Sequence, residues 1–264
     1  MSGTVRRSIW RVYRRGGLVP VIGGLTLAIG GCAGDRVRAG ADPGLGAVPG
    51  TALVEFTPGE RTRARIDPAT GEPAGFVRTR TTMDAGRDDG VGRWTVRTIE
   101  TDAEGGETEK SAGHVLGPYG GVYLAWSRSV KDTDPDGPPR LYVFDPPLIW
   151  YPGAIEPGAV FEDTARMTER DPEDESRAVL SGRALRRVAI VDHTSPGWPF
   201  EGEGWGVAAE LRVRVGPAEA VRRTTTRMDG RRAGDEFVDY GVRVLGVSIT
   251  RERWLVVAED PRPD

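Results

Sequence analysis

Apolar and polar residues alternate at every second position over long stretches of this chain, and twelve-residue segments with the spacing of an amphipathic helix are absent. The period of two is typical of a β-strand with one buried and one solvated face. The clearest example is segment 205–215, which we predict to be a half-buried antiparallel strand. Its expected buried face consists of Trp205, Val207, Ala209, Leu211, Val213 and Val215.

Turn-forming residues separate these alternating segments at regular intervals. Asp67–Gly71 is typical of a tight hairpin with Gly71 at positive φ, and Gly105–Gly106 and Asp229–Gly230 are similar. We therefore predict a mainly β, antiparallel fold with little helix. We expect about ten to twelve strands that form a curved sheet, a half-barrel, a barrel or a sandwich.

The alternation changes phase in the last long apolar segment, from Tyr240 to Val257. Val242 and Val244 occupy even positions, whereas Leu255 and Val257 occupy odd ones. The change falls beside Gly246, and we interpret it as a β-bulge that keeps one continuous buried face.

The chain begins with a basic head, which is followed by an uncharged apolar segment, residues 16–31. This segment ends in Ile29-Gly30-Gly31, directly before Cys32. This arrangement resembles the lipobox signal peptide of a bacterial lipoprotein. The resemblance implies cleavage between Gly31 and Cys32, lipidation of Cys32, and attachment to a membrane through the acyl chains. The predicted organisation is a signal peptide (1–31), a Gly/Ala/Pro tether (32–50) and a β domain (51–264), with two β-meander halves (51–140 and 141–264) as an option.

The same leader bears on the export route and the location. Its arginines favour the general secretory route, and Arg6-Arg7 followed by Ile9 leaves the twin-arginine route open. Ala33 follows the cysteine, so the aspartate typical of inner-membrane retention is not there. We therefore predict an exported, membrane-anchored cell-envelope protein, with the outer membrane or the periplasmic face favoured.

Composition narrows the possible chemistry. Cys32 is the single cysteine, so disulfides within the chain and cysteine-based metal sites are excluded. The whole chain has 36 basic and 39 acidic residues. Removal of the leader takes away five arginines, so the remaining chain would have 31 basic and 39 acidic residues and a formal charge of −8. An acidic domain does not favour nucleic acid as a partner. We interpret the basic strip Arg183–Arg187 as solvated strand edges.

A proline-rich apolar segment, Phe144–Gly158, precedes an aromatic strand start at Phe161. Together with Tyr240-Gly241-Val242 and the long strand after it, this pattern resembles uncharacterised envelope β proteins, over residues 140–257. Those proteins are related in fold to the periplasmic carriers of lipoproteins, which are curved sheets around an apolar cavity. The resemblance implies such a sheet here.

Two groups of residues are candidates for chemistry. Asp132, Asp134 and Asp136 match the opening of a calcium loop, but Val143 stands where the loop needs a bidentate glutamate, so a solvated acidic turn is favoured and no cofactor is predicted. Asp192-His193-Thr194-Ser195 places acid, base and hydroxyl in a row, whereas a catalytic triad is assembled in space. We therefore predict a protein without enzymatic activity.

Five aromatic residues form a possible rim for a ligand or partner, with plugging of the β core as the alternative: Trp150, Tyr151, Trp198, Phe200 and Trp205. The favoured function is binding or scaffolding of an unknown envelope protein. A carrier of a lipid or another apolar ligand in a β-sheet cavity is the first alternative. A weak calcium-binding or hydrolytic module is the second.

Overall fold

The computed structural model describes residues 46–53, 58–83, 92–102, 104–129, 138–230 and 232–258. Nearly all regular structure in these residues is antiparallel β, which confirms the predicted fold class. The elements are β1 (Val48–Pro49), η2 (Gly50–Leu53), β2 (Gly59–Ile66), β3 (Pro73–Met83), β4 (Arg93–Thr101), β5 (Glu107–Leu116), η3 (Pro118–Gly120), β6 (Val122–Ser129), β7 (Arg140–Tyr151), β8 (Ala154–Ile155), β9 (Val160–Arg170), β10 (Ala178–Asp192), β11 (Trp205–Val215), β12 (Ala218–Asp229), β13 (Arg232–Val244) and β14 (Val247–Ala258).

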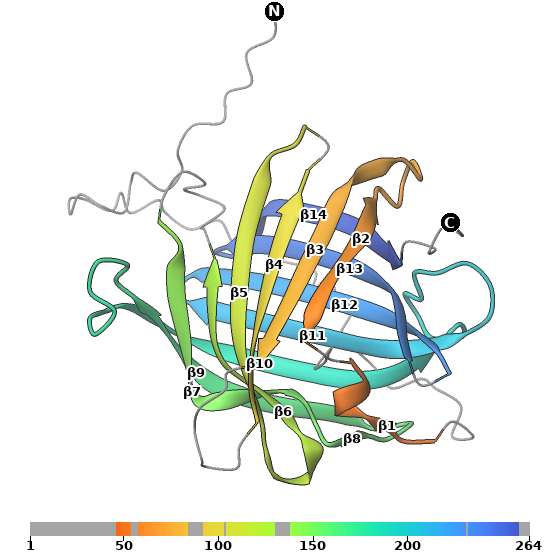
Figure 1. The fold of residues 1–264 in the computed structure, drawn as a ribbon, viewed down its shortest axis with the longest axis horizontal. Helices are drawn as coiled ribbons and strands as arrows, with labels where there is room; N and C mark the ends of the chain where they lie inside the picture. The colour runs from red at the N-terminus through yellow and green to blue at the C-terminus, as the bar shows by residue number, and fades with distance from the viewer. Residues whose placement is uncertain are drawn as a thin grey trace, which may run out of the picture.

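Twelve strands close into an up-and-down barrel, in the order β2 to β7, then β9 to β14, and back to β2. Figure 1 shows two walls: β3, β4 and β5 stand in front, and β11 to β14 cross behind them at a steep angle. The number of strands agrees with the predicted ten to twelve. Closure gives each of the twelve strands a paired neighbour on both sides over at least part of its length.

The two walls meet at two short seams. At the first seam, Arg63–Ile66 of β2 pair with Leu255–Ala258 of β14. At the second seam, Leu141–Asp145 of β7 pair with Arg166–Arg170 of β9. Beyond Asp145, the carboxylate of Asp163 still accepts a hydrogen bond from the backbone N–H of Ile149 at 2.7 Å. The lateral closure of the barrel therefore depends on pairings between strands far apart in the sequence.

Hairpins connect most neighbouring strands, as the turn residues predict. Gly71, between β2 and β3, has φ of +74°, and Gly230, between β12 and β13, has φ of +59°. The prediction of one continuous strand over 240–257 was wrong, but the segment does contain a bulge. Leu245 and Gly246 both have positive φ and make a two-residue turn between β13 and β14. The register then shifts at Ile249, between the pairs Arg243–Ser248 and Val242–Thr250.

One end of the barrel is closed by a small apolar cap. Val48 of β1 pairs with Ile155 of β8, and both are buried, although Val48 belongs to the segment predicted as tether. Glycine allows the close packing here: a Cβ on Gly153 would lie 2.0 Å from the backbone oxygen of Tyr119. Around the cap lies a buried cluster with nine members: Val48, Val122, Tyr151, Ile155, Val188, Ile190, Val207, Ala209 and Met228.

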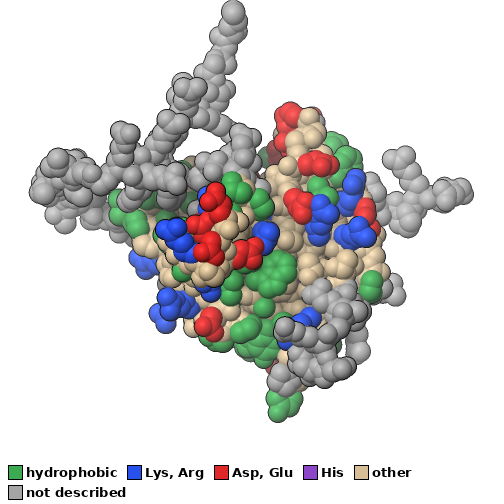
Figure 2. Space-filling model, turned by 60° about the vertical axis from the view of Figure 1, so that its left-hand side comes forward, with side chains coloured by type: hydrophobic (Ala, Val, Ile, Leu, Met, Phe, Trp, Pro, Cys, Tyr) green, Lys and Arg blue, Asp and Glu red, His purple; other side chains and the backbone are tan. Residues whose placement is uncertain are grey.

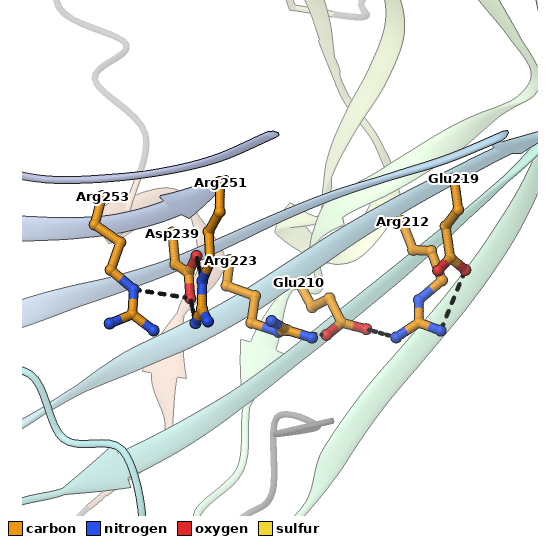
Figure 3. Close-up of polar contacts among 7 residues, drawn as sticks. All are labelled: Glu210, Arg212, Glu219, Arg223, Asp239, Arg251 and Arg253. Carbon is orange, nitrogen blue, oxygen red and sulfur yellow. Dashed lines mark hydrogen bonds and ion pairs between the residues drawn. The ribbon is translucent and has the colours of Figure 1, made fainter. Parts of the chain in front are cut away.

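The outer face of β11 to β14 carries a ladder of ion pairs, shown in Figure 3. Buried Glu210 accepts hydrogen bonds from Arg223 at 2.9 Å and from Arg212 at 3.1 Å. Asp239 accepts two from Arg251, at 2.8 and 3.1 Å. On the face shown in Figure 2, acidic and basic side chains likewise lie close together with apolar surface between them.

Within the described residues, no helix has the length and apolarity that a membrane crossing requires.

Candidate functional site: a cationic barrel lumen

Strand register decides which side chains enter the lumen, the space that the barrel encloses, because neighbouring residues in a strand point to opposite faces. Val207 and Ala209 of β11 pack in the cluster at the capped end, against which Trp205 also packs. Leu211, Val213 and Val215 pack against a second buried cluster, which contains Leu124, Phe144, Leu148, Ala165, Met167 and Ala184. The buried face predicted for segment 205–215 is therefore confirmed.

The register of β9 to β14 aligns six inward residues in one line across the back wall, and we call this line the inner row. Each member is the direct partner of the next on the neighbouring strand, so all six point into the lumen. The inner row consists of Asp163, Arg186, Leu211, Arg222, Tyr240 and Glu252. Two arginines therefore flank a leucine near the middle of the row.

Arg186 is the most deeply buried member of the row, with 2% of its surface exposed. Its Nε donates a hydrogen bond to the backbone oxygen of Trp150 at 3.1 Å, and its guanidinium lies 3.9 Å from the centre of the Trp150 ring. Its Nη2 has no hydrogen-bond partner among the described residues. Burial lowers the pKa of Arg186, and the positive charge of Arg222 lowers it further, whereas Tyr151 and Glu236 act to raise it.

Arg222 lies in the same row and, within the described part of the chain, makes no hydrogen bond or ion pair with its guanidinium. Its charge nevertheless reaches across the lumen to Glu100 of β4. Burial acts to raise the pKa of Glu100, but Lys110, Arg222 and Arg65 outweigh burial and lower it. The side chains of the two walls thus share one electrostatic environment.

The front wall and the β14–β2 seam contribute further cations to the lumen. Lys110 Nζ lies 3.0 Å from Glu100 Oε2, and Arg63 lies 3.6 Å from Glu236. The guanidinium of Arg65 lies 4.4 Å from the centre of the Trp254 ring, and its Nε is buried without a described partner. Glu100 and Glu236 thus each have a cationic partner. In contrast, Arg65 Nε and Arg186 Nη2 are buried donors without a described partner.

Inward side chains keep contact with solvent in one half of the lumen. Lys110 and Arg63 point inward, yet 34% and 30% of their side-chain surfaces are accessible. In contrast, Val188 and Ala209, at the capped end, are almost completely buried. The half of the lumen that is away from the cap is therefore partly accessible to solvent.

His114 of β5 lies at the boundary between these two halves. Its ring packs edge-on against Trp150 at 6.2 Å between centroids, and its Nδ1 has no described partner. Burial, assisted by the charge of Arg186, lowers the pKa of His114 to about 4. The imidazole is therefore neutral at pH 7.

The predicted site residues lie in several places. Trp150, Tyr151 and Trp205 belong to the packing around the capped-end cluster. Trp198 and Phe200 pack against each other at 5.1 Å in the connection between β10 and β11. Gly31, Cys32 and the calcium candidates Asp132, Asp134 and Asp136 lie outside the described residues. Their assigned roles stay predictions, and the described residues contain no cluster of metal-ligating side chains.

The segment Asp192–Ser195 forms a turn after β10. The carboxylate of Asp192 accepts hydrogen bonds from the Thr194 N–H at 3.0 Å and from the Ser195 hydroxyl at 3.2 Å. His193 is exposed. The carboxylate thus helps to close the turn.

The interpretation of Arg183–Arg187 as solvated strand edges was wrong for Arg186. The outward Arg183 is exposed as predicted, whereas the outward Arg187 side chain is only 19% exposed and pairs with Glu162. Arg186 shares the inward phase of Ala184, Val188 and Ile190. The alternation of the segment therefore contained a usable signal. No such signal marks Arg222, because β12 alternates little in hydrophobicity.

Fold and site together define an antiparallel β-barrel with a cationic, partly solvated lumen. No family model, curated protein or solved structure matches this chain.

Proposed function

We propose that this protein is a non-enzymatic binding protein that holds a small molecule in its barrel lumen. The observation that carries this proposal is the solvent-accessible space around inward-pointing side chains such as Lys110 and Arg63. A ligand that enters this space displaces water from an apolar and aromatic wall, and a few polar groups orient it. A carrier role was the first alternative from sequence, and the lumen geometry favours it over scaffolding.

The chemistry of the lumen supports binding over catalysis. Arginine guanidinium groups stay protonated, so they bind and orient anions but do not shuttle protons. General acid–base catalysis is most effective when the pKa of the group lies near the working pH. The pKa of His114, at about 4, is far from this range.

A lumen-filling substitution tests the proposed binding. In the full chain, Val213→Trp should fill the partly exposed apolar strip of β11 and weaken the binding of a neutral apolar dye, Nile red, by about tenfold or more. Dye fluorescence in a titration measures the affinity. The matched control is Val115→Trp, an outward position of β5, which should leave the affinity unchanged.

Two results would contradict the proposal. Wild-type protein that binds no dye and carries no copurified small molecule in native mass spectrometry would leave the lumen without a binding role. Equal dye affinity for the Val213→Trp and Val115→Trp chains would place the dye elsewhere.

Partner binding is the second candidate function, and one surface favours it. Leu245 and Val247, at the tip of the β13–β14 hairpin, are 77% and 63% exposed, and Ile249 is exposed beside them. Exposed apolar side chains that lie together are typical of contact surfaces. An empty lumen combined with a bound protein partner would favour this function.

We also propose that Cys32 anchors the protein in the cell envelope, as its lipobox pattern indicates. Cys32→Ser should move the protein from the membrane fraction to the soluble fraction, because the thioether that joins protein and lipid needs the thiol. Fractionation and incorporation of labelled fatty acid measure the two effects. A Cys32→Ser chain that stays in the membrane fraction as wild type does would refute the anchor.

A further inference from the structure

We propose that the lumen ligand is a single-chain anionic amphipath, a carboxylate with an alkyl tail, whose head binds between Arg186 and Arg222. This inference rests on the proposed function and gives its ligand a chemical class. Three features of the described residues support it: an unused guanidinium donor, a pair of neighbouring like charges, and an adjacent apolar strip.

The unused donors define the head site. Arg186 and Arg222 flank Leu211 in the inner row, so their Cα atoms are about 10 Å apart across two strand spacings. Two long side chains at this spacing can converge on one small anion. Arg186 Nη2 has no described partner although the side chain is 2% exposed, and a buried donor without a partner is costly.

The two arginines also repel each other. Besides burial, the charge of Arg222 lowers the pKa of Arg186, whereas Tyr151 and Glu236 act to raise it. An anion between the two arginines would add countercharge and accept a hydrogen bond from Arg186 Nη2. A carboxylate suits this task because its planar pair of oxygens matches the planar fork of a guanidinium.

Nearby acids do not fill this role. Asp163, beside Arg186 in the inner row, accepts the hydrogen bond of the Ile149 N–H. Glu100 pairs with Lys110 and Glu236 pairs with Arg63, although the charge of Arg222 also acts on Glu100 and that of Glu236 on Arg186. Glu252, at the end of the row, is exposed on β14. Among the described residues, no carboxylate therefore accepts a hydrogen bond from Arg186 or Arg222.

The tail site begins where the head site ends. Leu211, Val213 and Val215 point inward along β11, and their partial burial contrasts with the full burial of Val207 and Ala209. This strip covers roughly 13 Å of strand. Ala112 and Tyr142 of the front wall pack against the same cluster, so apolar residues of both walls lie along this strip. The inner row thus separates the closed apolar end from an accessible apolar strip.

The test compares dodecanoate with dodecan-1-ol, which share chain length and differ in charge. The wild-type full chain should bind dodecanoate about ten- to a hundredfold more tightly, because charge-assisted hydrogen bonds hold the head. Arg222→Met should abolish this preference and retain alcohol binding. Isothermal titration calorimetry measures both affinities. The control Arg214→Met removes an outward arginine of the same β11 wall and should keep the preference.

The outcomes separate this inference from the proposed function. Equal affinity of wild type for acid and alcohol would overturn the anionic ligand and leave a lumen carrier in place. Failure to bind either compound, together with failure to bind Nile red, would overturn the proposed function itself. Loss of the preference in Arg214→Met as much as in Arg222→Met would attribute it to overall charge and refute the head site.

Discussion

Glu210→Ala is expected to lower the free energy of unfolding by about 3–5 kcal/mol. The carboxylate of Glu210 is fully buried and joins Arg212 and Arg223 across two strands (Figure 3). Its removal leaves two guanidinium groups, each less than a third exposed, without their countercharge on that side. Urea denaturation followed by tryptophan fluorescence measures the change, as a shift of the midpoint at constant slope.

The control is an ion pair with similar geometry but greater exposure. Arg97 donates a hydrogen bond to Glu109 Oε2, and the two side chains are 49% and 52% exposed. Glu109→Ala should therefore change the free energy of unfolding much less than Glu210→Ala does. A Glu210→Ala protein as stable as the Glu109→Ala protein would show that the buried ladder contributes little to stability.

The second large effect is a loss of stability in mild acid that depends on His114. Its pKa is about 4 in the folded protein, against 6.5 for an unperturbed histidine. Between these values the unfolded chain binds a proton that the folded chain does not, so stability falls as the pH decreases from 6.5 to 4. The loss amounts to about 3 kcal/mol, and urea denaturation at a series of pH values should detect it.

His114→Gln should remove this component, whereas His193→Gln, at the exposed histidine, should keep it. Asp239 and Glu100 do not mask the effect above pH 4.5. Their folded pKa values are lowered from 3.8 and 4.5, against the effect of burial, by Arg251 and Lys110 among others, so their contributions are lost only below those values. Identical pH dependence for wild type and His114→Gln would contradict the assignment.

Local sequence patterns predicted the strands because alternation and turn chemistry act over a few residues. Segment 205–215 shows its inward face directly, and Asp67–Gly71 shows its turn. The change of phase near Gly246 was also visible, but a bulge and a two-residue hairpin shift the alternation in similar ways. The strand pairing shows both: Val244 pairs with Val247 across a hairpin, and a bulge follows at Ile249.

The candidate site was much harder to predict. Arg186 follows the phase of Val188 and Ile190, so its burial could have been inferred. Arg222 and Arg65 carry no such mark, because arginines occur on both faces of this barrel: Arg222 points inward and Arg223 outward. Their significance lies in the unused donors, and these depend on neighbours from distant strands.

Sequence alone therefore predicted a mainly β chain of about ten to twelve strands and their turns, which the structure confirms, and the lipobox around Cys32 stays a prediction. Tertiary structure decided the closure at the β14–β2 seam, the separation of a filled end from a partly accessible lumen, and the placement of Arg186 and Arg222 in one inward row. The physical reason is the sequence separation of the residues that interact. Alternation and turn preference depend on residues that are a few positions apart, whereas closure and charge clustering depend on pairing between strands that are far apart in the sequence.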